Sequence, residues 1–73
     1  LILMKFIPGT TFINKTKKNT RFFAYNKIYI LQDIKPVPAE KIVTYIFNVD
    51  GGLKEVNFNS IKEAENWLAT IVV

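Results

Sequence analysis

The side chains of this chain best suited to act on a ligand are cations, gathered in a segment without apolar residues at positions 14–21. Cations that neutralise phosphates release condensed counterions, so a polyanion is the natural ligand of such a segment. Aromatic residues follow at once, and rings that point outward can stack on unpaired bases. The sequence therefore predicts contact with a DNA or RNA backbone. The residues expected to take part are Lys15, Lys17, Lys18, Arg21 and Lys27 on phosphates, and Tyr25 or Phe22 in stacking.

The charges are divided unevenly along the chain, which has 10 basic and 6 acidic residues. Asp33 is the only acid in residues 1–35, whereas acids outnumber bases in residues 36–73. The cations of the first part are Lys5, Lys15, Lys17, Lys18, Arg21, Lys27 and Lys35. A polarised surface of this kind can also steer association with an acidic protein surface. Alternatively, the segment is only a solvated connection whose lysines keep a small protein in solution.

No pattern in the chain predicts catalysis. Because histidine and cysteine are absent, a Ser-His or Cys-His nucleophile and the usual zinc sites cannot form. The six acids are scattered over several expected elements, and no glycine-rich phosphate loop is present. We therefore expect a non-enzymatic binding module without metal or cofactor.

Length and composition indicate a single domain over residues 1–73. A domain this small removes only roughly 60% of its unfolded surface from water, so most large apolar side chains must join one core. The absence of cysteine fits a reducing compartment such as the cytoplasm. The longest apolar run, residues 1–4, is far short of the ~20 residues of a membrane span, so no membrane contact is expected.

Strands and one helix are expected from local patterns. Residues 41–49 alternate with Val43, Tyr45, Phe47 and Val49 on one side, as in a half-buried strand. Asp50-Gly51-Gly52 then favours a tight hairpin turn. The spacing of Ser60 and Glu63 is typical of a capping box, in which the glutamate bonds the serine amide. The expected strands are 4–7, 10–13, 22–31, 41–49 and 54–58, and the expected helix is 61–70.

Other segments add detail to this outline. Pro8-Gly9 indicates a turn, and Lys35-Pro36-Val37-Pro38 indicates an extended surface connection. Trp67 and Leu68 are expected in the core, on the apolar side of the helix. Ile42 and Ile46 lie on the second face of their strand, where they are either buried as well or part of an exposed patch suited to dimerisation or peptide capture.

Together these elements predict an α+β fold, with a small curved antiparallel sheet or partly open barrel of four to five strands and one C-terminal helix. An open sheet with a helix across one face is the second choice. The element order, the loop at 14–21, the turn at 50–52 and the terminal helix resemble SH3-like and chromodomain-like small barrels. The resemblance implies binding of nucleic acid or peptides. A homodimer through a sheet face or edge stays open.

The composition also bears on the alternative function. Abundant Asn, Lys, Ile and Phe are typical of an AT-rich genome, and bacteriophages are one source of such genomes. Small phage proteins often bind the machinery of their host. The alternative function is therefore a protein interaction module, of a phage-like kind, that recognises an acidic partner surface.

Overall fold

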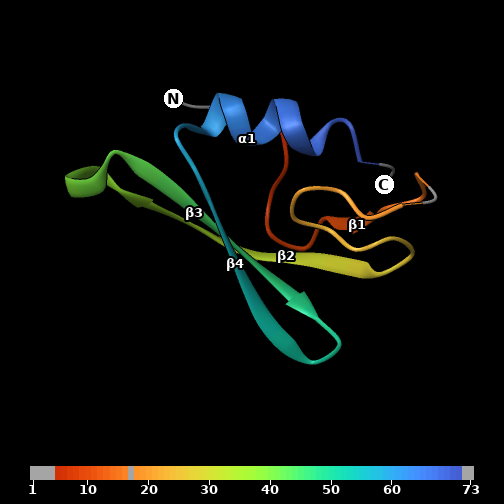
Figure 1. Cartoon of the computed structure of the whole chain (residues 1–73). Coiled ribbons are helices and arrows are strands. Elements are labelled where there is room, and N and C mark those ends of the chain that lie inside the picture. The colour runs from red at the N-terminus through yellow and green to blue at the C-terminus, as the bar shows by residue number, and fades with distance from the viewer. Residues whose placement is uncertain (1–4, 17, 72–73) are drawn as a thin grey trace.

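The computed structural model describes residues 5–16 and 18–71, which form one open sheet with a helix across it (Figure 1). The elements are β1 (Thr11–Ile13), β2 (Ile28–Val37), the short 3₁₀ helix η1 (Pro38–Glu40), β3 (Ile42–Val49), β4 (Gly52–Phe58) and α1 (Ile61–Leu68). All strand pairs are antiparallel, and the sheet order is β1-β2-β3-β4. The α+β fold with a small antiparallel sheet and a C-terminal helix is thus confirmed. The sheet does not close into a barrel.

The β3–β4 hairpin forms where the sequence predicts it. Its turn is made by Asp50 and Gly51, whose φ angles of 53° and 82° are the positive values that a type I′ turn requires. The register pairs Tyr45 with Val56 and continues to the last residue of β4. Partners across an antiparallel pair share a face, so the alternation of β3 places its apolar side chains beside those of β4.

The helix α1 begins after Ser60, whose side-chain oxygen accepts a hydrogen bond from the Glu63 amide at 3.1 Å. The capping-box prediction, in which the Glu63 carboxylate bonds the serine amide, is wrong on this point. The carboxylate accepts a hydrogen bond from the amide of Asn59, one residue earlier, also at 3.1 Å. An additional backbone donor ahead of the helix is satisfied in this way. The regular helix ends at Leu68, slightly before the predicted end.

One face of the sheet carries the core, and we call it the covered face because α1 packs there. Phe47, Tyr45 and Leu68 are fully buried in this core. The complete set of its buried side chains is Phe12, Phe23, Tyr29, Leu31, Val43, Tyr45, Phe47, Val56, Phe58, Ala64, Leu68 and Ile71. Trp67 is half-buried against the same cluster, so the prediction that it belongs to the core is confirmed in part, and the prediction for Leu68 is confirmed.

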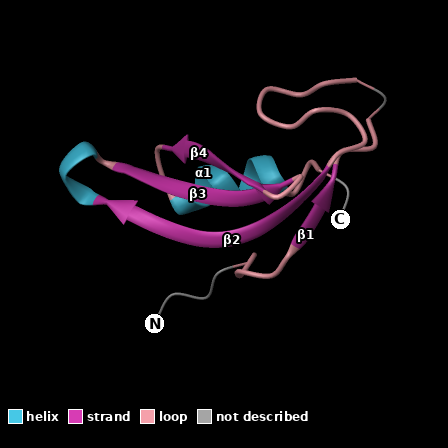
Figure 2. Cartoon of the chain, turned by 90° about the horizontal axis from the view of Figure 1, so that it is seen from below, coloured by secondary structure: helices cyan, strands magenta, loops and turns pink. Residues whose placement is uncertain are grey.

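The opposite face, which we call the open face, is covered by no helix or strand in the described part of the chain (Figure 2). Ile46, at its centre, is nevertheless only 9% exposed, and Ile42 is half-buried. Ile46 is shielded by its neighbours on both sides, since it pairs with Asp33 of β2 and Glu55 of β4. The exposed apolar side chains of this face lie elsewhere, at Ile28, Ile30 and Leu53.

The predicted first strand is wrong where the structure describes it. Lys5–Ile7 bend instead of pairing, and Met4 lies outside the described residues. The predicted turn at Pro8-Gly9 is present, with Gly9 at a φ of 99°. The chain turns because the Thr10 hydroxyl and amide both donate to the Ile7 carbonyl. The Lys5 amide donates to the carboxylate of Glu65 on α1 and not to a neighbouring strand.

The predicted strand at 22–31 is also wrong in its first half, because β2 begins only at Ile28. Successive side chains of a strand point to opposite faces. Phe22 and Phe23, by contrast, both turn toward the core, which an extended backbone does not allow. Aromatic residues are typical of strands, but here the rings of Phe22 and Phe23 anchor a loop to the core.

β2 extends further than predicted, through Lys35–Val37, which the sequence assigned to a surface connection. Pro36 pairs with Val43 of β3 within this strand. A proline is tolerated there because β1 accompanies β2 only as far as Ile30, so the missing amide proton would have pointed to an unoccupied edge. The chain leaves the strand at η1.

Candidate nucleic-acid interface

The connection between β1 and β2, residues 14–27, is the basic loop of this structure. It contains the predicted cation-rich segment and extends six residues beyond it, through Lys27. β1 pairs with the start of β2, since Ile13 lies opposite Ile28, so the two ends of the loop lie side by side. The loop emerges at the β1 end of the sheet (Figure 1). Compact loops with adjoining ends and internal packing are frequently functional.

Asn14 fixes the path of the loop from inside. Its side chain is fully buried, and its amide group donates to the carbonyls of Lys18 at 3.0 Å and of Phe23 at 3.1 Å. Its side-chain oxygen accepts from the Thr16 amide at 3.1 Å and from the Thr16 hydroxyl at 2.7 Å. A buried amide that uses both its donor and its acceptor side holds the backbone in one arrangement.

The second half of the loop is fastened by further hydrogen bonds. The Thr20 hydroxyl and the Thr20 amide both donate to the Phe23 carbonyl, each at 2.9 Å. The Tyr29 hydroxyl accepts from the Ala24 amide at 2.7 Å. The Asn26 amide donates to the Asn14 carbonyl at 2.7 Å, which closes the base of the loop. The cations therefore stand on a structured support rather than on an unstructured connection.

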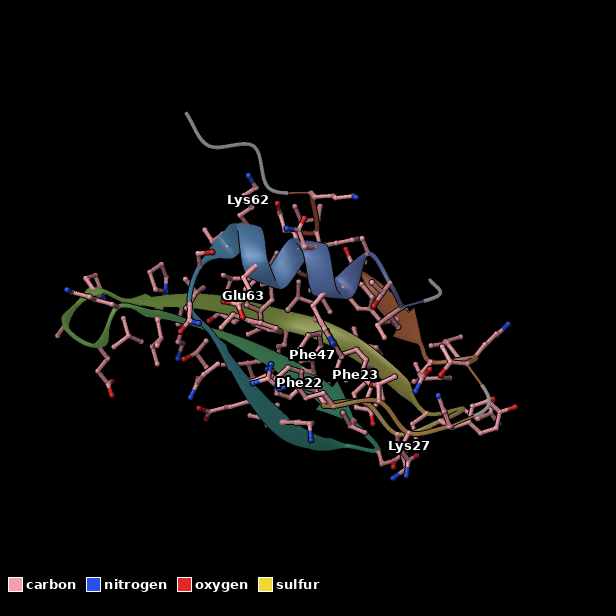
Figure 3. All side chains as sticks on the ribbon, turned by 45° about the horizontal axis from the view of Figure 1, so that its top comes forward. Phe22, Phe23, Lys27, Phe47, Lys62 and Glu63 are labelled. Atoms are coloured by element: carbon pink, nitrogen blue, oxygen red, sulfur yellow. The ribbon has the colours of Figure 1, made fainter. Side chains whose placement is uncertain are left out.

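Phe23 anchors this support in the core. Its ring stacks on Tyr29, with centroids 3.9 Å apart and planes 7° from parallel. It also meets Phe47 edge-on at 5.0 Å and Trp67 at 5.1 Å. Figure 3 shows Phe22, Phe23 and Phe47 gathered between the loop and the sheet below α1. Phe23 is thus unable to reach a ligand.

Phe22, a predicted stacking residue, lies half-buried beside Phe23. Its ring meets Phe58 at 5.4 Å and Trp67 at 5.0 Å, both in edge-to-face geometry. The guanidinium carbon of Arg21 lies 4.7 Å from the centroid of the same ring. The structure therefore places Phe22 under Arg21, where it orients the guanidinium by a cation–π contact.

The exposed cations of the loop in the described residues are Lys15, Lys18, Arg21 and Lys27, and the first three form no ion pair there. Lys17 lies outside the described residues. Lys27 differs from the others, because its ammonium group is 3.2 Å from the carboxylate of Asp50 in the β3–β4 turn. The charge of Lys27 is partly balanced in this way, and the free charge of the loop is concentrated nearer its middle.

Tyr25 is the other predicted stacking residue, and it is exposed to 44% of its full area. Its amide donates to the side-chain oxygen of Asn19 at 2.9 Å, which fixes the backbone from which the ring projects. Of the three aromatic residues between positions 14 and 27, Tyr25 is the one with an exposed ring. The two predicted stacking residues thus differ: the ring of Tyr25 is accessible, whereas the ring of Phe22 supports Arg21.

The role of Asn14 was missed by the sequence-based prediction, although a signal for it exists. An asparagine two residues before a threonine can accept from the threonine amide and so form an Asx turn. Asn14-Lys15-Thr16 has this spacing at the point where the extended run of β1 ends. The burial of Asn14, by contrast, depends on the packing of Phe23 and could not be read from the sequence.

The described residues contain no cluster of three acidic side chains able to hold a metal ion, and they enclose no pocket. No helix among them has the length and apolar character needed to cross a membrane.

No family model, no curated protein and no solved structure matches this chain. The likeness to SH3-like and chromodomain-like barrels accordingly stays a prediction from element order.

Proposed function

We propose that this protein is a non-catalytic module that binds the backbone of a nucleic acid through the basic loop, with no preference for sequence. The observation that carries the proposal is the ordered loop itself, which presents Lys15, Lys18 and Arg21 exposed and without ion pairs in the described structure. No acidic residue precedes Asp33 in the chain, so nothing within the loop opposes a phosphate. The cytoplasm is the compartment that this proposal favours.

Each cation has a distinct part in the proposal. Arg21 is oriented by the ring of Phe22 and offers a planar group that can make two hydrogen bonds to one phosphate. Lys15 and Lys18 contribute point charges on flexible stems, and Lys17 adds a fourth charge in the sequence between them. Tyr25 provides the one accessible aromatic ring of the loop, which is suited to stacking on an unpaired base. Phe22 acts through Arg21 rather than by stacking.

The test is the salt dependence of binding to single- and double-stranded oligonucleotides, measured by fluorescence anisotropy. Three to four phosphate contacts predict that log K falls with log salt at a slope of about −3 to −4 on duplex DNA. The variant Lys15→Gln, Lys18→Gln, Arg21→Gln should flatten this slope toward zero. Oligonucleotides of different sequence and equal length should bind alike.

A matched control separates the effect of the loop cations on binding from the effect of net charge. Lys35, Lys41 and Lys62 are exposed and lie outside the loop, so their replacement by glutamine removes the same formal charge. This control should keep most of the slope. If neither single- nor double-stranded nucleic acid binds at low salt, or if the loop variant keeps the full slope, the proposal fails and an acidic protein surface becomes the favoured ligand.

A further inference from the structure

The outer edge of β4 forms a second candidate binding surface, separate from the basic loop. β4 is the last strand of the sheet and pairs only with β3 (Figure 2). Apart from this pairing, residues 52–58 make no backbone hydrogen bond within the described part of the chain. A row of backbone donors and acceptors along an edge strand is a template on which another strand can pair.

The geometry of the hairpin determines which groups face outward. In a two-residue type I′ hairpin the residues that flank the turn form a hydrogen-bonded pair, here Val49 and Gly52. Hydrogen-bonded and non-hydrogen-bonded pairs then alternate along the strands. The amides and carbonyls of Leu53, Glu55 and Asn57 consequently point away from β3, and all three residues are exposed.

The free edge of β2 is different, because several features there prevent strand pairing. Pro36 has no amide proton, and the Ile34 amide is occupied by the Asp33 carboxylate at 2.8 Å. The register also shifts between Leu31 and Asp33, which distorts the strand. β4 has no proline, and none of its amides is bonded by a side chain in the described structure. Of the free edges of β2 and β4, only that of β2 is thus protected by such features.

The side chains of β4 argue against a second copy of this chain as the occupant. Antiparallel pairing that uses all seven residues of β4 places Glu55 opposite Glu55 of the second copy. Like charges directly opposite each other across a strand pair are destabilising. Each copy also carries a net charge of +4. A segment of another protein avoids both sources of repulsion.

We propose that β4 receives an extended segment of a partner protein, added antiparallel as a fifth strand. Main-chain hydrogen bonds to Leu53, Glu55 and Asn57 would supply affinity, and the side chains opposite β4 would supply specificity. Charge complementarity calls for a basic residue opposite Glu55 and an acidic residue opposite Lys54. Leu53, with 64% of its area exposed, calls for an apolar residue. Because the partner segment runs antiparallel to β4, its residues in order from the N-terminus are a basic, an acidic and an apolar residue.

The probe is a synthetic peptide of about ten residues, the length of a long strand, with Arg-Glu-Val at its centre. A second peptide with the two charges exchanged, Glu-Arg-Val, is its control. Binding is measured by isothermal titration calorimetry, and the contact is located by NMR amide exchange. The protein should prefer the first peptide by on the order of tenfold, since two cross-strand charge pairs change sign between the peptides. Added protection should appear at the amides of Leu53, Glu55 and Asn57.

The double variant Lys54→Glu, Glu55→Lys keeps composition and net charge unchanged and should invert this preference. The loop variant Lys15→Gln, Lys18→Gln, Arg21→Gln should bind the first peptide as the parent protein does, which separates this proposal from the nucleic-acid one. The proposal is overturned if neither peptide binds at millimolar concentration, if the preference does not invert, or if protection appears at other amides. Concentration-dependent dimerisation that protects the same three amides would replace the peptide with a second copy.

Discussion

At the scale of single residues, Tyr45 is buried with a hydroxyl that has no hydrogen-bond partner among the described residues. Burial raises the pKa of this phenol above its usual value, and the negative charge of Glu65 raises it further. The ionised form is therefore disfavoured in the folded protein relative to the unfolded chain. This difference in pKa makes the free energy of unfolding depend on pH. The contribution is fully present below the pKa of tyrosine in the unfolded chain, about 10, and is lost as pH rises through the pKa of Tyr45 in the folded protein.

Replacing Tyr45 with phenylalanine should therefore stabilise the protein. Removing an unpartnered buried hydroxyl should raise the free energy of unfolding at neutral pH by about 1 kcal/mol. The decline of stability above pH ~10 should also become shallower, because the variant lacks the phenol whose pKa is raised in the folded protein. Urea unfolding followed by tryptophan fluorescence across this pH range measures both effects. The exposed Tyr25→Phe is the control, and a Tyr45→Phe variant less stable than its parent would contradict the expectation.

At the scale of elements, α1 depends on its packing. It has eight residues, and isolated helices of that length are marginal in water. Its fully buried side chains are Ala64 and Leu68, which join the core of the covered face. The cap at Ser60 sets where the helix begins, but burial of this stripe keeps it folded.

Truncating Leu68 to alanine should lower the free energy of unfolding by about 2–5 kcal/mol, through lost apolar contact and the cavity left behind. That is a large part of the stability expected of so short a chain. Asn66→Ala, on the exposed side of the same helix, should change stability by less than about 0.5 kcal/mol. Chemical denaturation of both variants provides the measurement. Equal midpoints would show that the stripe does not hold the helix.

The elements also show which parts of the fold are encoded locally. The β3–β4 hairpin and α1 were predictable, because alternation, an Asp-Gly-Gly turn and a serine cap each act within a few residues. The start of β2 was not predictable. Phe22 and Phe23 have the propensity of strand residues, but packing against core residues far along the chain places them in a loop. Likewise, Pro36 appeared to end a strand, and only the absence of a neighbour at that edge allows it within one.

The candidate site was predictable to a similar extent. The cations of the loop and their exposure follow from their type, and the structure exposes Lys15, Lys18 and Arg21. The sequence could not distinguish Phe22 from Tyr25, because their difference arises from contacts with Phe58 and Trp67, far along the chain. The pairing of Lys27 with Asp50 arises in the same way, from the position of a turn that the loop meets only in the folded state.

At the scale of the whole molecule, the unpaired loop cations repel one another, and this repulsion is not offset by ion pairing elsewhere in the described structure. The one ion pair found there, Lys27–Asp50, joins two exposed side chains. Exposed pairs of this kind contribute little to stability. Screening by salt should therefore relieve more repulsion than it removes attraction.

We expect the midpoint of urea unfolding to rise between ~0.1 M and ~1 M NaCl, as the screening length falls from ~10 to ~3 Å. Binding to nucleic acid should weaken over the same range, so that salt moves stability and affinity in opposite directions. The loop variant Lys15→Gln, Lys18→Gln, Arg21→Gln should show a smaller rise of the midpoint. A midpoint that falls with salt would mean that attractive charge interactions dominate the folded protein.

The order of the strands in the sheet, β1-β2-β3-β4, is also their order in the chain. No connection crosses over the sheet, so each strand can add to one that immediately precedes or follows it. The turns into β3 and β4 are tight, and the basic loop is the longest connection between two strands. The entropy cost of closing a loop grows by only about 0.6 kcal/mol for each doubling of its length. Between the buried residues Asn14 and Phe23, the segment that presents the cations could thus gain residues during evolution at little entropic cost to the assembly of the sheet.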